Sequence, residues 1–180
     1  MDSIFNTPNL LLRPIEPNDI DHIYTWENNT TLWQVGQSSL PFSRHILEQY
    51  INTVNDDIFE AKQLRLIIET KEEKQIIGAV DLFDFDPLHQ RAGVGILIYP
   101  EEKKHKGYAT EALKAIEEYA FFFLGIHQLY ATVTEDNIAS IHLFQKAGYQ
   151  LTSTKKEWIK RGNQWLDQHI FQLITPLSSL

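Results

Sequence analysis

The segment from Arg91 to Thr134 limits the fold of this chain more than any other. Its first residues, RAGVGILIY, predict a strand, and a basic turn follows them. From Tyr108 to Leu124, apolar residues recur at steps of three and four with charged residues between them, which predicts an amphipathic helix. Gly125 ends the helix and another apolar run predicts a second strand. This order of elements predicts a mixed α/β fold.

The turn before this helix has the composition of an anion site. It reads KKHKG over residues 103–107. A helix start exposes unpaired N–H groups and carries the positive end of the helix dipole, and Gly107 lets a ligand approach the backbone. We expect a pyrophosphate there. Neither the P-loop pattern nor the dinucleotide-binding pattern is completed, because Gly93 and Gly95 stand inside a strand.

Two helices precede most of the predicted strands. The first follows the strand in NLLLRPIE, with Asn18 as its candidate cap and Ile23 and Tyr24 on its apolar face. Ser43 can cap the second helix, RHILEQYINTV. Its predicted apolar stripe consists of Ile46, Leu47, Tyr50, Ile51 and Val54.

Two hairpins and one more helix complete the pattern. QLRLIIET and QIIGAVDLFDF flank the charged turn KEEK, and the C-terminal residues predict a hairpin that turns at Gly162. EDNIASIHLFQKAGY predicts a helix capped by Asp136 and ended by Gly148. No repeat or linker divides the chain, so residues 1–180 are expected to form a single domain.

Composition narrows the classes of partner. Without cysteine there is no disulfide, thiolate metal site or cysteine nucleophile. The 24 acidic and 16 basic residues argue against a nucleic-acid surface and favour cationic small molecules, although an acidic surface for solubility explains the same excess. No segment approaches the roughly 20 apolar residues of a membrane span, and no basic-apolar leader begins the chain. We expect a cytoplasmic protein without a membrane partner.

Two stretches resemble the signatures of the Gcn5-related N-acetyltransferases (GNAT). In YPEEKKHKGYATEAL, Lys104, Gly107 and Ala109 stand where the family's acetyl-CoA loop has Arg or Gln, then Gly, then Gly or Ala. TEDNIASIHLFQKAGY resembles the second signature, in which an Asn is followed three residues later by Ser and the end is a Gly-aromatic pair. Within the family, the chain resembles the spermidine/spermine N-acetyltransferases and the ribosomal-protein N-terminal acetyltransferases.

The resemblance implies a fold and a reaction. The fold is a twisted, mostly antiparallel sheet of about seven strands with about four helices, split between two parallel strands where acetyl-CoA enters. The reaction is direct transfer of acetyl from acetyl-CoA, the co-substrate, to a primary amine without a metal. A polyamine or other small amine is the leading acceptor. A protein N-terminus and a module that binds acyl-CoA without turnover are the alternatives, and the oligomeric state, homo-oligomer included, stays open.

The resemblance also implies which residues hold the coenzyme. Backbone N–H groups from His105 to Thr110 would bind the pyrophosphate beside Lys104 and Lys106, and the strand end at Ile98 and Tyr99 would offer backbone groups to the pantetheine arm. The lysines as a solvated charge run are the alternative. The predicted set is Ile98, Tyr99, Lys104, His105, Lys106, Gly107, Tyr108, Ala109, Thr110, Asn137, Ser140, Phe144 and Lys146.

Four of these residues belong to the predicted helix before Gly148. Asn137 would hydrogen-bond the arm, and Ser140, Phe144 and Lys146 would line its channel. Each of the first three also has a structural interpretation: Asn137 as a helix cap, Ser140 as a solvated residue and Phe144 as part of the core.

The chemistry requires a proton acceptor, because an alkyl amine with a pKa of about 10.4 is protonated near neutral pH. Relatives carry a Glu base where this chain has Gly93, and a Tyr acid where it has Phe144. Asp81, which matches an acidic position in the polyamine branch that the chain resembles, is the predicted base. Strand alternation puts it on one face with Phe83 and Phe85, an apolar surrounding that would raise its pKa. A solvated or salt-bridged Asp81 is the alternative.

Other polar residues have weaker predictions. His89 would relay a proton or contact the substrate, with an inert loop histidine as the alternative. Tyr130 and Tyr149 are further candidates for the acid. Ser38 and Ser39 stand where polyamine enzymes carry an acidic pair, which counts against polyamine binding at that segment. The acids that could still attract a cation are Glu27, Glu48, Asp56, Asp57, Asp84 and Asp86.

Overall fold

A computed structural model of the chain describes residues 4–33, 40–54 and 57–175. Seven strands form one sheet in the order β1-β2-β3-β4-β5-β7-β6, and every neighbouring pair is antiparallel except β4 and β5. The strands are β1 (Leu10–Pro14), β2 (Leu64–Thr70), β3 (Ile76–Asp86), β4 (Arg91–Ile98), β5 (Gln128–Thr134), β6 (Gln150–Arg161) and β7 (Gln164–Ile174). The predicted mixed α/β sheet is confirmed.

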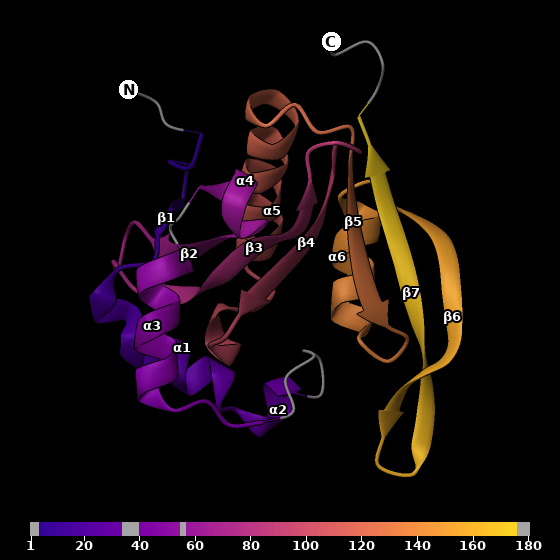
Figure 1. The fold of residues 1–180 in the computed structure, drawn as a ribbon, viewed down its shortest axis with the longest axis horizontal. Coiled ribbons are helices and arrows are strands. Elements are labelled where there is room, and N and C mark those ends of the chain that lie inside the picture. The colour runs from indigo at the N-terminus through magenta and orange to yellow at the C-terminus, as the bar shows by residue number, and fades with distance from the viewer. Residues whose placement is uncertain (1–3, 34–39, 55–56, 176–180) are drawn as a thin grey trace.

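Helices cover both faces of this sheet (Figure 1). They are η1 (Pro17–Asp19), α1 (Ile20–Glu27), α2 (Thr30–Trp33), α3 (Arg44–Val54), α4 (Ile58–Ala61), η2 (Glu101–Lys103), α5 (Tyr108–Glu118), η3 (Tyr119–Phe123) and α6 (Ile138–Lys146). The four helices predicted from the sequence are α1, α3, α5 and α6, and the described residues add short turns between them. One core cluster joins the sheet to α5 and α6, and another joins it to α1 and α3.

The start and the apolar face of α1 differ from the prediction. Asp19, not Asn18, is the N-cap residue of α1, and its carboxylate accepts the N–H of Glu16 at the start of η1, at 2.8 Å. The buried stripe passes through Ile23 and Trp26. Tyr24 is 39% exposed, and its ring instead lies 5.4 Å from the guanidinium of Arg44.

The predicted cap of α3 is confirmed, and its stripe is narrower than expected. The Ser43 hydroxyl accepts the N–H of Ile46 at 3.3 Å. Leu47 and Ile51 are buried, whereas the Ile46 side chain is 48% exposed. The side chain of Val54 lies outside the described part of the structure. Tyr50 is half-buried against the same core, so Leu47, Tyr50 and Ile51 hold this helix on the sheet.

On the other face of the sheet, the end of α5 and the start of α6 also differ from the prediction. Regular α-helix stops at Glu118, and a π-helical turn, η3, carries the chain to Gly125. The wider turn rotates the apolar stripe, which leaves Phe123 71% exposed. The cap of α6 is Asn137, because Asp136 forms an ion pair with Arg161 of β6.

The parallel strands β4 and β5 pair only at their beginnings. Residues 91–93 of β4 lie opposite residues 128–130 of β5, and Gly93 and Tyr130 are the last pair. Beyond this point β4 stays on β3 and β5 stays on β7, so the two strands separate toward their C-terminal ends (Figure 1). The predicted split between two parallel strands is therefore present.

Candidate functional site

The start of α5 presents unpaired N–H groups at the end of the sheet where β4 and β5 have separated. Within the described residues, the backbone N–H groups of residues 105–110 have no acceptor, although the N–H of Glu111 donates to the Gly107 carbonyl at 3.0 Å. His105 and Gly107 have φ values of 60° and 87°. Left-handed residues in a turn shape concave sets of N–H donors, which suit anions. The geometry of an anion site is thus present where the sequence predicts it.

Two of the lysines in this turn form ion pairs within the described part of the protein, and the third does not. The Lys103 side chain is 7% exposed and forms an ion pair with Glu73, which follows β2, so it is a structural residue and not part of the free positive charge we expected. The hydrogen bond from Lys103 lowers the pKa of Glu73. Lys104 pairs with Glu101 in its own turn. Lys106 is exposed and has no carboxylate partner in the described chain.

Ile98 and Tyr99, at the end of β4, differ in how their backbone groups are paired. The N–H of Tyr99 donates to the Ile77 carbonyl of β3 at 2.9 Å, so this group is already used inside the sheet, and the role of the Tyr99 backbone toward the coenzyme stays a prediction. Because antiparallel pairing alternates, the N–H and carbonyl of Ile98 point to the side that β5 has left. The Tyr99 ring packs on Trp26, with ring centroids 6.2 Å apart.

The second helix start, that of α6, lies at the same end of the sheet, because α6 follows β5 as α5 follows β4 (Figure 1). Asn137 caps it by accepting the N–H of Ser140 at 3.2 Å. Phe144 is 4% exposed and packs edge-on against Tyr149, which places it in the core. Ser140 is half-buried and Lys146 exposed. The structural interpretations of Asn137 and Phe144 are present, and their roles in a channel stay predictions.

Asp81 lies in an ion-pair cluster and not in the apolar surrounding we predicted. Its carboxylate binds Arg65 of β2 through two contacts of 2.6 and 3.2 Å, and Arg65 also binds Glu27 of α1 at 2.8 Å. Phe85 does not share its face, because a register shift in β3 turns that ring into the opposite core. The salt-bridged alternative is the one observed. The base role of Asp81 stays a prediction, and a carboxylate held by guanidinium is poorly prepared for it.

His89 lies apart from Asp81, in the turn between β3 and β4. Its side chain is 63% exposed, and its Nδ1 lies 2.8 Å from a carboxylate oxygen of Asp86. The backbone and side-chain hydrogen bonds from His89 lower the pKa of Asp86 to about 2. The structure therefore does not bring the two predicted catalytic residues together, because the strand between them holds them at different levels of the sheet.

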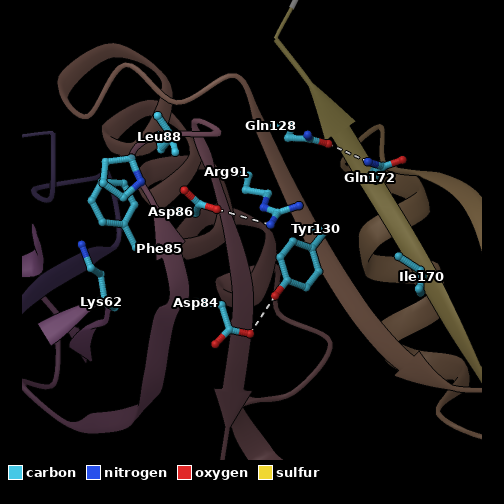
Figure 2. Close-up of a pocket in the computed structure, with 11 residues that line it drawn as sticks. Lys62, Asp84, Phe85, Asp86, Leu88, Arg91, Gln128, Tyr130, Ile170 and Gln172 are labelled. Carbon is cyan, nitrogen blue, oxygen red and sulfur yellow. Dashed lines mark hydrogen bonds and ion pairs between the residues drawn. The ribbon is translucent and has the colours of Figure 1, made fainter.

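A pocket of about 890 Å³ lies beside the closed end of the β4–β5 gap. Figure 2 shows Asp84 and Tyr130 facing one another in it, and the Tyr130 hydroxyl donates to Asp84 at 2.9 Å. Burial, together with the hydrogen bond to Asp84, raises the pKa of Tyr130 to about 12. Sequence reasoning named both residues but missed their pairing. No motif marks the β-bulge that brings them together.

Neither metal ligands nor a membrane helix is found in the described chain. Across residues 4–33, 40–54 and 57–175, no three His, Asp or Glu side chains gather as they would around an ion. Of the helices in those ranges, none has the length and apolar composition to cross a bilayer. Ser38, Ser39 and Asp56 lie outside the described residues.

The separated parallel strands, with two helix starts at their open end, define the class of α/β acyltransferases that bind a coenzyme thioester. Residues 9–150 match the acetyltransferase (GNAT) domain. The chain belongs to this family.

Several bacterial N-acetyltransferases are similar to the chain. An uncharacterised N-acetyltransferase, YoaA of Bacillus subtilis, is 26% identical over 180 residues, which cover 98% of this chain and 99% of the relative. The spermidine N(1)-acetyltransferase of Escherichia coli is 29% identical over 140 residues, or 78% of this chain and 72% of the relative.

Solved structures agree with these relatives. The spermidine N-acetyltransferase of Vibrio cholerae in complex with CoA and spermine aligns with a TM-score of 0.82 at 25% identity, covering 92% of this chain and 95% of that one. A dodecameric structure of the same enzyme has a TM-score of 0.76 at 25% identity, with 92% and 93% covered. The chain is an acetyl-CoA-dependent N-acetyltransferase.

Proposed function

We propose that this enzyme acetylates a primary amine of a small cationic molecule, with a polyamine or diamine as the leading acceptor. The observation that carries the proposal is the β4–β5 gap with different chemistry at its two ends. Unpaired N–H groups of residues 105–110 lie at the open end, and a pocket containing Asp84 and Asp86 lies beside the closed end. A pyrophosphate suits the first and an ammonium group the second.

The coenzyme would be held as follows. The N–H groups of residues 105–110 bind its pyrophosphate, with the side chains of Lys104 and Lys106 beside it. The backbone of Ile98 faces the pantetheine arm. Asn137 and Ser140 at the start of α6 face the arm from the other strand, with Phe144 and Lys146 further along that helix. The thioester then points toward Gly93, where the two strands meet.

The relatives support the choice of acceptor. Two of the similar enzymes are spermidine N-acetyltransferases, and one of them was solved with spermine. The net charge of -8 also favours a cationic substrate, as the relatives do. The exposed carboxylate of Asp84 supplies the local attraction that Ser38 and Ser39 cannot.

The experiment is a measurement of CoA release from acetyl-CoA with a panel of acceptors. Spermidine, diamines, aminoglycosides and peptides with free N-termini are compared at equal concentration. We expect a kcat/KM for spermidine or a diamine at least about tenfold above that for the peptides, a difference of about 1.4 kcal/mol. Preference for an N-terminal peptide would refute the proposal, and so would the absence of CoA release with every amine.

We also propose that the enzyme forms a homo-oligomer. The Vibrio cholerae relative is described as dodecameric. Leu151, Trp158 and Trp165 of the β6–β7 hairpin are each more than half exposed, and β6 is the outer strand of the sheet. Large apolar side chains on an open edge favour a partner surface. Light scattering during gel filtration should give a mass above the 21.0 kDa of one chain, and a monomer would refute this assembly.

A further inference from the structure

A β-bulge in β3 turns Asp84 away from its own strand. The pairing of β3 with β4 shifts between Phe83 and Asp86, and Asp84 has a φ of 49°, which is uncommon for residues other than glycine. Bulges redirect side chains and are frequent beside active sites. As a result, the Asp84 carboxylate crosses β4 and reaches the Tyr130 hydroxyl on β5 at 2.9 Å.

Gly93 lies between the strands of Asp84 and Tyr130, and its missing side chain leaves room for the Phe83 ring. Phe83, Gly93 and Tyr130 are in register across three strands, and Gly93 and Tyr130 are the last pair before the gap opens. The rings of Phe83 and Tyr130 meet edge to face with centroids 5.9 Å apart. A Cβ at Gly93 would lie 2.2 Å from the Phe83 ring. The space at Gly93, where the family resemblance implies a Glu base, is therefore filled by the Phe83 ring, and the Asp84 carboxylate reaches the Tyr130 side chain of the same register row.

Asp84 keeps one oxygen for a ligand. Figure 2 shows one carboxylate oxygen on the Tyr130 hydroxyl and the other directed away from it. Within the described chain nothing donates to that second oxygen, and no Lys or Arg lies within 4.0 Å of Asp84. Of the other charged groups of the pocket, Arg91 and Asp86 form an ion pair, and Lys62 has no carboxylate partner in the described chain. Arg91 binds Asp86 at 3.3 Å, and Lys62 lies 6.0 Å from the ring centre of Phe85.

On the basis of the acetyl transfer proposed above, we propose that Asp84, oriented by Tyr130, binds the ammonium group of the acceptor at the closed end of the gap and takes its proton. The structure thereby assigns Asp84, rather than Asp81, as the catalytic carboxylate and Tyr130 as its positioning residue. Asp81 is neutralised by Arg65 at 2.6 Å, whereas Asp84 is exposed and bound only by a neutral hydroxyl.

The transfer balances with these groups. The acceptor arrives as an ammonium ion, and the Asp84 carboxylate takes one proton from it and later releases it to solvent through the pocket. The freed lone pair forms a C–N bond to the acetyl carbonyl carbon. The C–S bond breaks with its electron pair on sulfur, and the second proton of the nitrogen passes to the thiolate. The products are the amide and CoA thiol.

The test is the pH dependence of kcat/KM for wild type and Asp84→Asn with the best amine of the panel. At about pH 7 we expect a loss of at least about tenfold, because the amide cannot accept the proton. The loss should shrink toward about pH 10, where the acceptor loses its proton unaided. The Kd for acetyl-CoA, measured by calorimetry, should stay within about twofold, since Asp84 lies away from the anion site.

Two further variants keep the test decisive if Asp84→Asn folds poorly. Tyr130→Phe retains the carboxylate and removes only the orienting hydroxyl, so a smaller loss with the same pH trend is expected. Glu118→Gln, on the opposite face of the sheet, removes an equal charge and should leave kcat/KM unchanged.

The outcomes separate this inference from the proposed function. If wild type acetylates an amine and both Asp84→Asn and Tyr130→Phe match it at every pH, the role of Asp84 is refuted and acetyl transfer stands. A loss that is equal at all pH values would also refute proton acceptance. If wild type acetylates no amine, the proposed function fails first, and the assignment of Asp84 fails with it.

Discussion

The ring of Phe83 fills the space above Gly93. A β-carbon added to Gly93 would lie 2.2 Å from the Phe83 ring, closer than any real contact. Gly95, two residues along the same strand, has its nearest such contact at 3.7 Å, again to Phe83. The two glycines therefore differ in what they permit. Gly93 is required by its neighbour, whereas Gly95 is not.

This difference predicts the stability of two matched variants. Gly93→Ala should cost about 1–3 kcal/mol, because either the Phe83 ring or the backbone must move. Gly95→Ala should change the free energy of unfolding by less than about 0.5 kcal/mol. Urea unfolding measures both. In a double-mutant cycle, adding Phe83→Ala should remove most of the destabilisation caused by Gly93→Ala. If Gly93→Ala and Gly95→Ala lower the free energy of unfolding equally, the packing described here is wrong.

The sequence predicted the framework better than the site. Helix and strand order follows from periodicity, which is local, and the anion site follows from a glycine and cations in one short turn. The partners of Asp81 and Asp84 come from other strands, so no local pattern could identify them. Alternation along β3 predicts Phe85 beside Asp81, and the bulge reverses this, because one extra residue moves every later side chain to the other face.

Asp81→Asn tests the ion-pair cluster around Arg65. The substitution leaves a guanidinium that is 24% exposed with Glu27 as its remaining carboxylate. We expect a loss of about 1–3 kcal/mol in the free energy of unfolding, typical of a hydrogen bond between charged groups. The shape of the pH profile of kcat/KM should not change. Asp21→Asn, which breaks a well-exposed pair with Arg44, is the control and should cost under about 0.5 kcal/mol.

The opposite result for Asp81 has a clear meaning. A flattened pH profile with unchanged stability would return the base role to this residue.

Substitutions of the lysines before α5 should affect either the affinity for acetyl-CoA or the stability of the fold, depending on the lysine. Reversing charge with Lys104→Glu and Lys106→Glu together should raise the Kd for acetyl-CoA by at least about tenfold, because like charge then faces the anion. The effect should weaken at high salt. Lys103→Met should instead lower the melting temperature and change the Kd little, since its charge is already bound to Glu73. Calorimetric titration and thermal unfolding measure the two effects, and a larger Kd change for Lys103→Met would contradict this division.

Glu117 should make stability fall as pH rises. Its carboxyl projects from α5 toward the Tyr149 hydroxyl, and within the described chain neither that hydroxyl nor the buried carboxyl oxygen Oε1 has a hydrogen-bond partner. Burial raises the pKa of Glu117 from 4.5 to about 7, more than the nearby Tyr149 hydroxyl lowers it. Between these two values the folded chain holds a proton that the unfolded chain has lost. The unfolded state therefore binds fewer protons, and stability decreases with pH until the folded carboxyl has ionised above about 7.

Glu117→Gln removes this titration while keeping the size of the side chain. Urea unfolding from about pH 5 to about pH 8 should show little difference from wild type at the acid end and a gain of up to about 3 kcal/mol at the alkaline end. Glu48→Gln, on the exposed face of α3, should give a curve parallel to wild type. If the Glu117→Gln curve is also parallel, the carboxyl is ionised in the fold at neutral pH, and the contact between α5 and Tyr149 tolerates a charge that burial should forbid.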